Sequence, residues 1–146
     1  MVATGGTGDL GPAARVTVEG GGVGPVQDGA DAFRRAAREQ VECGADVVRA
    51  PVTGGVLTPH SDPEVAHLTR EEGTAAFEVA RIYGERTSAH RHGVEGVRLA
   101  VDCGVDIVEH ATFVHREPAM LDRMADDGVC MSPELASAHG MADAEG

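Results

Sequence analysis

The sequence has 146 residues, which is enough for one ordinary globular domain with its own core. Its formal net charge is −12, so it lacks the basic surface that nucleic acids and anionic membranes attract, and we expect neither as a partner. All 12 basic residues are arginines, which excludes lysine chemistry such as a Schiff base or a phosphate-binding P-loop.

Strand and helix patterns alternate along the chain. In order, the sequence predicts a short first strand at 2–6, a helix at 31–44, a strand at 46–52, a helix at 68–84, a strand at 86–92, a helix at 94–104, a strand at 105–113, a helix at 117–128 and a last strand at 129–135. Such alternation indicates parallel strands with right-handed crossovers. An α/β fold is therefore predicted, either an open doubly wound sheet or a part of a (β/α)8 barrel.

Several residues mark where the predicted helices begin and end. Thr69 and Glu72 have the spacing of a capping box, and Pro118 suits the first turn of its helix. A glycine follows the end of each helix, at Gly44, Gly84, Gly104 and Gly128. We treat 1–146 as a single domain, with a Gly-rich strand and loop at 1–27, βα repeats at 28–135 and a flexible tail at 136–146.

Two segments of the chain repeat one another. Residues 41–55, VECGADVVRAPVTGG, and residues 100–114, AVDCGVDIVEHATFV, both join a helix end to Cys-Gly-x-Asp and a short apolar strand. Cys43 and Cys103 hold matching places in the repeat, so we expect both to be small buried residues. The cysteines have no CxxC spacing, and no signal peptide or membrane span is evident, which favours a cytoplasmic protein without disulfides.

One glycine motif admits a different function. GTGDLG, residues 6–11, matches the GxGxxG pattern of dinucleotide-binding loops. Such a loop must open a helix whose N-terminus meets the phosphates, whereas Pro12 and RVTVEGGG follow here. A plain glycine loop is the preferred interpretation, and a phosphate- or nucleotide-binding α/β domain is kept as an alternative.

Histidines follow two of the predicted strands. Because parallel strands present their carboxyl ends at one rim, His90 and His110 are expected to converge there and to bind a divalent metal, with zinc as the expected ion. His92 lies two residues after His90 and would point to the same side. Glu109 precedes His110, so we expect it to face the opposite way, into the barrel wall or into a position behind the metal ligands. The alternative is a pair of polar strand ends without a metal.

At these residues the chain resembles the metal-dependent amidohydrolases, specifically the prolidase- and imidazolonepropionase-like members. The resemblance rests on the GAD strand, TGG, the AHxH strand and the GVDxxEH strand, within ADAFRRAAREQVECGADVVRAPVTGGVLTP, TSAHRHGVEGVRLAVDCGVDIVEHATFV and GVCMSPEL. It implies a (β/α)8 barrel with one or two divalent metals that hydrolyses amide bonds through a metal-activated water. The chain would cover roughly barrel strands three to seven.

The resemblance assigns roles to four positions. His90 and His110 match the metal-binding histidines of the fifth and sixth strands, and His92 matches a position that often contacts substrate. Arg49 falls where binuclear relatives keep a carbamylated lysine that bridges two metals. Guanidinium cannot coordinate a cation, so we expect at most one ion, with Arg49 either repelling a second ion or binding a substrate carboxylate.

No complete catalytic set is present in this sequence. The first-strand HxH of the family, and the eighth-strand aspartate that takes the proton from the attacking water, match no position. The predicted function is that of a metal-dependent hydrolase acting on amide bonds of a small molecule or dipeptide, inactive by itself. The alternative within this family is a non-catalytic remnant that binds a small carboxylate through Arg49. An incomplete barrel has open strand edges, so we also expect self-association.

Overall fold

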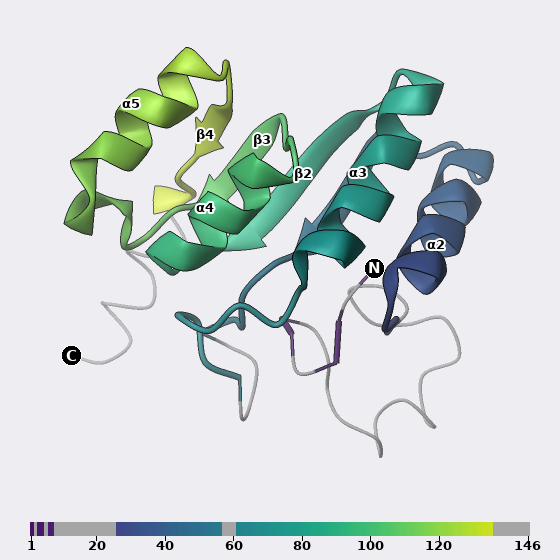
Figure 1. Ribbon diagram of the computed structural model, residues 1–146, viewed down its shortest axis with the longest axis horizontal. Coiled ribbons are helices and arrows are strands. Elements are labelled where there is room, and N and C mark those ends of the chain that lie inside the picture. Colours follow the sequence, from purple (N-terminus) through teal and green to yellow (C-terminus); the bar gives the residue numbers. More distant parts are fainter. Residues whose placement is uncertain (2, 5, 8–25, 57–60, 136–146) are drawn as a thin grey trace.

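The computed structural model describes residues 1, 3–4, 6–7, 26–56 and 61–135. Four parallel strands form one sheet in the order β1 (Val47–Pro51), β2 (Arg86–Arg91), β3 (Ile107–His110) and β4 (Cys130–Ser132). The helices are α2 (Ala30–Glu42), α3 (Arg70–Tyr83), α4 (Val94–Asp102) and α5 (Pro118–Asp126), with a 3-10 turn, η1, at Val114–Arg116 (Figure 1). Sequential strands are neighbours, as in a barrel, which confirms the predicted α/β fold.

Some predictions fall on residues that the structure does not describe. The loop at 8–25, His60 and the tail at 136–146 lie wholly outside the described residues, and so does most of the GTGDLG motif. The predicted first strand at 2–6 lies partly outside them, and its described residues, 3, 4 and 6, are not in a strand. Among the described residues, no helix is long and apolar enough to cross a membrane.

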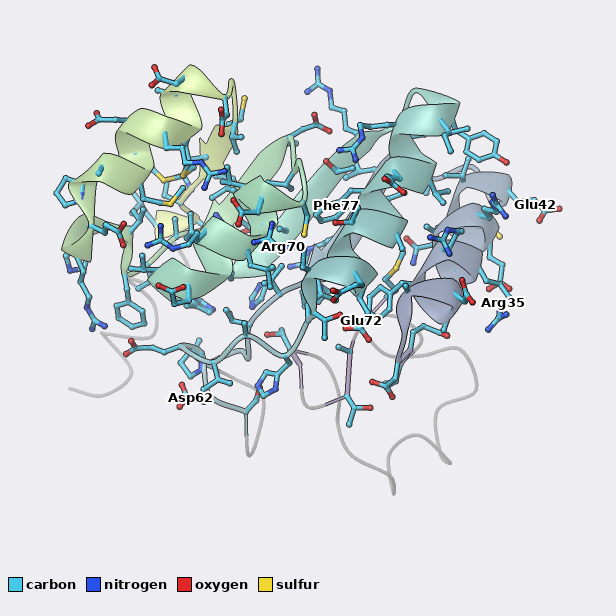
Figure 2. All side chains as sticks on the ribbon, in the orientation of Figure 1. Arg35, Glu42, Asp62, Arg70, Glu72 and Phe77 are labelled. Atoms are coloured by element: carbon cyan, nitrogen blue, oxygen red, sulfur yellow. The ribbon has the colours of Figure 1, made fainter. Side chains whose placement is uncertain are left out.

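The ends of α3 are set by the residues that the sequence marks. Thr69 accepts a hydrogen bond from the Glu72 backbone N–H, and the Glu72 carboxylate accepts one from the Thr69 backbone, so the predicted capping box is confirmed. The same carboxylate also accepts a bond of 2.6 Å from the backbone N–H of Gly29, just before α2 (Figure 2). Buried Glu72 therefore ties together the N-terminal ends of two neighbouring helices.

The two repeated segments end their helices in the same way. Gly44 and Gly104 end their helices with φ of 86° and 79°, in the left-handed region that favours glycine. One prediction about the repeat is wrong: Cys103 is buried, but Cys43 is exposed. The difference arises because Cys103 packs against α3, where its Sγ would lie 2.8 Å from a Cβ placed at Gly73.

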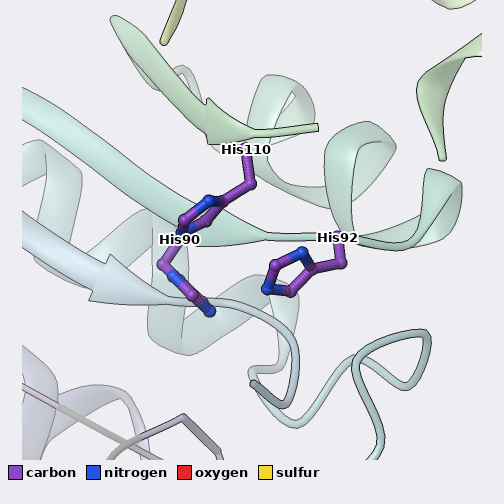
Figure 3. Close-up of side chains that lie close together, drawn as sticks. All are labelled: His90, His92 and His110. Carbon is purple, nitrogen blue, oxygen red and sulfur yellow. The ribbon is translucent and has the colours of Figure 1, made fainter. Parts of the chain in front are cut away.

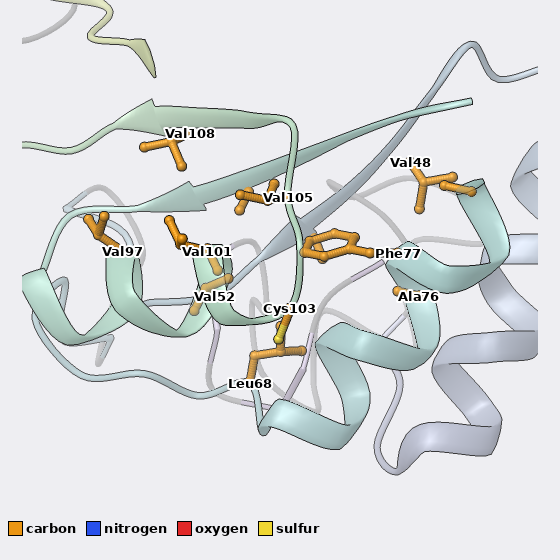
Figure 4. Close-up of a cluster of buried hydrophobic side chains, with 14 of the residues drawn as sticks. Val48, Val52, Leu68, Ala76, Phe77, Val97, Val101, Cys103, Val105 and Val108 are labelled. Atoms are coloured by element: carbon orange, nitrogen blue, oxygen red, sulfur yellow. The ribbon is translucent and has the colours of Figure 1, made fainter. Parts of the chain in front are cut away.

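The hydrophobic core lies between the sheet and the helices. Val48 of β1, Val108 of β3 and Val52, which follows β1, point toward the layer that holds Phe77 of α3 and Val101 of α4 (Figure 4). All of these side chains are buried. Aromatic residues are scarce, so small aliphatic side chains fill this layer and allow the elements to approach closely. Residues that alternate with these valines, such as Arg49 and Glu109, point to the other side of the sheet, which we call the inner face.

A close approach of α4 to the sheet depends on Gly96. A Cβ built there would overlap Cγ2 of Thr53 and would lie 3.2 Å from Cβ of Arg91. We expect Gly96→Ala to lower the free energy of unfolding by about 1 kcal/mol or more, because overpacking outweighs the helix propensity gained from alanine. Chemical denaturation measures this, with the exposed Glu95→Ala as the control in the same helix. A Gly96→Ala variant as stable as the wild type would contradict the packing.

Candidate metal centre

The register of the sheet brings the predicted site residues to one rim. His90 pairs with Pro51 on one side and with Glu109 on the other, and Arg91 pairs with His110. Because the strands are parallel, these positions all lie at carboxyl ends, where α/β barrels build their sites. His90 and His92 lie two residues apart and share the inner face, as the spacing predicts.

His110 reaches this face by a departure from strand geometry. Strict alternation would turn it toward the helices, on the side of Val108. Instead, His110 and Ala111 have φ of 60° and 51°, in the left-handed region, which costs a residue with a side chain roughly 1–2 kcal/mol. This turn carries the imidazole of His110 over to His90 and His92.

Three imidazoles meet at the rim. The ring of His110 lies with its centroid 4.6 Å from that of His90 and 4.7 Å from that of His92, and the rings of His90 and His92 are 5.0 Å apart (Figure 3). Each ring offers one nitrogen such that all three nitrogens lie within 4.8 Å of one another. His92 therefore joins the two predicted ligands in one potential metal-binding group.

The ring nitrogens suit an ion. Both ring nitrogens of His90 and Nε2 of His92 are buried and have no hydrogen-bond partner among the residues that the structure describes. Nδ1 of His92 lies 2.8 Å from Oγ1 of Thr112; with the proton on Nδ1, the ring donates to Thr112 and keeps the lone pair of Nε2 for a ligand. Buried polar atoms without partners are costly, and a cation at the centre of the group would satisfy one nitrogen of each ring.

Electrostatics keeps these rings neutral. Burial, reinforced by the charge of Arg49, lowers the pKa of His90 to about 3. Burial and the neighbouring His110 lower the pKa of His92 to about 4. Burial also lowers the pKa of His110, although Glu134 and Glu109 act in the opposite direction. Only neutral imidazole can bind a metal, so the folded protein presents all three rings in the binding form at neutral pH.

Arg49 and Glu109 form an ion pair across the inner face. Nε of Arg49 donates to both carboxylate oxygens at 2.9 Å, and Nη2 donates to Oε2 at 2.5 Å. Ser88, on the strand between them, also donates to the Glu109 carboxylate. The expectation that Glu109 faces away from the site is wrong: it lies on the inner face, because the left-handed turn moves His110 rather than Glu109.

This pair changes the electrostatic role of Arg49. Burial alone would raise the pKa of Glu109, but the hydrogen bonds from Arg49 and Ser88 outweigh it and lower that pKa. The carboxylate is therefore ionised and offsets much of the guanidinium charge. Each side chain is already hydrogen-bonded to the other. A substrate carboxylate would therefore have to compete with Glu109 for the guanidinium of Arg49.

Other polar residues near the rim were not predicted. Glu134, two residues after β4, places Oε2 at 3.5 Å from Nδ1 of His110, and Glu109, His110 and Glu134 form a second group with possible ligand atoms within 4.8 Å of one another. Thr112 and Ser88 are the other polar contacts that sequence reasoning missed. The sequence could have indicated them only by their position, because Ser88 and Thr112 each lie two residues from a predicted histidine ligand. Of the remaining histidines that the structure describes, His115 is exposed and His67 is half-buried.

Comparisons with known proteins agree with this geometry. No protein-family model matches the sequence. Ochratoxinase from Aspergillus niger is 34% identical over 98 residues, which are 66% of this chain and 20% of that protein. The crystal structure of A. niger ochratoxinase superposes with a TM-score of 0.89 at 26% identity, over 99% of this chain and 36% of that one. A Xaa-Pro dipeptidase with methionine bound in its active site superposes with a TM-score of 0.80 at 29% identity, over 97% and 35%.

These matches and the parallel βα order establish the family. The chain belongs to the amidohydrolase superfamily and carries a central part of its TIM-like barrel. It spans about a fifth of the length of the curated relative that it matches.

The ion pair across the inner face can be measured. In a double-mutant cycle with Arg49→Met and Glu109→Gln, in metal-free buffer, we expect a coupling energy of about 1–2 kcal/mol, because Glu109 is largely shielded while Arg49 is partly solvated. The control is a second cycle with Arg116→Met and Glu64→Gln, an ion pair of 2.7 Å whose side chains are about half exposed. A coupling no larger than that of the exposed pair would contradict the structural role of Glu109.

Proposed function

We propose that this chain forms the metal-binding part of a hydrolase that cleaves amide C–N bonds in a small molecule or dipeptide. Its histidines His90, His92 and His110 would hold one divalent ion, with zinc as the expected metal. The observation that carries the proposal is the convergence of three imidazoles, of which His90 and His92 have buried ring nitrogens without a hydrogen-bond partner among the described residues. Amidohydrolase, prolidase and dipeptidase neighbours of similar fold support the reaction class.

The set of donors suits catalytic zinc. Catalytic zinc sites commonly use three protein ligands and leave a fourth position open. When bound, zinc supplies a water of lowered pKa and polarises a carbonyl oxygen. The protein's own residues prepare the site: burial keeps His90 and His92 neutral, and Thr112 orients the ring of His92.

A single ion fits this rim better than two. At the position where binuclear relatives bridge two metals, Arg49 offers no lone pair. Its partner Glu109 is engaged by three hydrogen bonds from the guanidinium and one from Ser88, so it is withheld from a second ion. Because Glu109 also offsets the charge of Arg49, engagement of this carboxylate, more than repulsion by the guanidinium, supports a mononuclear site.

The proposal extends to the residue that would contact the substrate. We propose that Arg49 faces the substrate, with its guanidinium partly exposed. His92, which the family resemblance places in contact with substrate, would instead serve the metal, because Thr112 and the ion take its two ring nitrogens. A substrate carboxylate would bind Arg49 by sharing it with Glu109, which disfavours the alternative of a simple carboxylate receptor. The general base expected from the family matches no residue in this sequence, so we expect the chain alone to bind metal without turning over substrate. Self-association through the strand edges is a further proposal.

Metal titration tests the central residues. We expect the wild type to bind one zinc ion, and His90→Ala, His92→Ala and His110→Ala each to weaken binding by at least about tenfold, because each removes one of three ligands. Competition with a chromophoric chelator measures the affinity, and the exposed His115→Ala is the matched control. The assignment fails if the control loses as much affinity as the three variants, or if all four proteins bind alike.

A further inference from the structure

A fully buried arginine lies directly behind the histidine cluster. Arg91 stands between His90 and His92 in β2, so its side chain alternates with theirs and points away from the inner face, toward α4. Its relative exposure is 0%, and a Cβ placed at Gly96 of α4 would lie 3.2 Å from its Cβ and 3.6 Å from its Cγ. The absence of a side chain at Gly96 leaves the room that Arg91 fills.

The guanidinium of Arg91 donates hydrogen bonds to backbone carbonyls and forms no ion pair with a carboxylate of the described residues. Nη1 donates to the carbonyl of Ala89 at 2.8 Å and to the carbonyl of Glu109. Nε and Nη2 are buried, and within the described part of the chain they have no hydrogen-bond partner. Burial of a cation without an anionic partner is expensive, and an apolar residue of similar length would fill the same space at lower cost. Such a cost calls for a role beyond packing.

The carbonyl of Glu109 is the group that precedes the left-handed turn. It accepts from Arg91 and also from the backbone N–H of Ala111 at 2.8 Å, which closes a tight turn around His110. The backbone of Arg91 itself accepts from the same Ala111 N–H at 3.2 Å. Arg91 therefore holds the residue before the turn with its side chain and the residue after His110 with its carbonyl.

We propose that Arg91 is a positioning residue that stabilises the left-handed backbone of His110 and Ala111 and so directs the His110 imidazole to His90 and His92. The inference rests on the proposed metal site for its consequence, but its structural part can be measured in the metal-free protein. Without the guanidinium, the turn loses a charged donor to its first carbonyl, and the strand can relax toward ordinary alternation, which points His110 to the helix side.

Arg91→Met and Arg91→Lys test this role. In metal-free protein, the Cα and Cβ chemical shifts of His110 and Ala111 report the left-handed backbone, and ring-to-ring NOEs report the contact between His90 and His110. We expect Arg91→Met to fold but to lose both signals, and to bind zinc about 10–100-fold more weakly, the range typical for lost supporting contacts of metal ligands. Arg91→Lys keeps a cationic donor, so we expect intermediate shifts and a smaller loss of zinc affinity.

The control is Met124→Ala in α5, which removes buried volume but none of these hydrogen bonds; it should keep the His110 shifts and the NOEs. Wild-type shifts and NOEs in both Arg91 variants would overturn the inference. If Arg91→Met does not fold, Arg91→Lys decides alone, with intermediate shifts supporting the role and unchanged shifts refuting it. A wild type that binds no zinc, in a series where Arg91→Met still loses the turn, would refute the proposed metal site and leave the positioning role standing.

Discussion

The candidate site depends on the left-handed backbone at His110 and Ala111. Parallel pairing alone places His90 and His92 on the inner face, but it would leave His110 on the helix side with Val108. Two consecutive residues with positive φ and a side chain are unfavourable, and they persist only where surrounding contacts impose them. As a result, the imidazole of His110 lies close to those of His90 and His92, and the three side chains form one group of potential metal ligands.

The two faces of the sheet differ in the kind of side chain that they carry. On the helix side, alanines, valines and two phenylalanines pack tightly, and Gly96 lets α4 approach β2. On the inner face, charges and imidazoles replace apolar side chains: Arg49, Ser88 and Glu109 form a hydrogen-bonded network beside the three histidines. Burial raises the cost of any unpaired polar group there. Arg49 and Glu109 satisfy one another, whereas buried ring nitrogens of His90 and His92 have no hydrogen-bond partner among the described residues.

Much of the fold was predictable from the sequence because local signals agree with the tertiary structure. The alternation of helices and strands from residue 30 onward, the capping box at Thr69 and the terminal glycines such as Gly104 are found where the sequence predicts them. The two-residue period of a β-strand also predicted that His90 and His92 share one face of the sheet. The predicted helices and strands ran one to a few residues too long, because their ends depend on hydrogen bonds that residue types do not specify.

Among the features of the site that were not predicted, two were missed for different physical reasons. The left-handed turn at His110 contains no glycine, so the residue types do not predict it. It also depends on contacts with Arg91, which lies far away in the sequence. The Arg49–Glu109 pair did have a signal: both residues lie three positions after the aspartate of their repeat, so opposite charges occupy equivalent places on β1 and β3. Reading that signal requires knowing that only β2 separates the two strands, which is information about tertiary structure.

The central claim is that His90, His92 and His110 act together as ligands of one ion. X-ray absorption spectroscopy of the one-to-one zinc complex tests it most directly, because the scattering pattern of imidazole rings counts the histidines bound to the metal. The structure predicts three imidazole ligands at the roughly 2.0–2.1 Å typical of zinc–nitrogen bonds, and two after substitution of His92 by alanine. Two or fewer imidazoles in the wild type, or sulfur ligation by an exposed cysteine such as Cys130, would contradict the account.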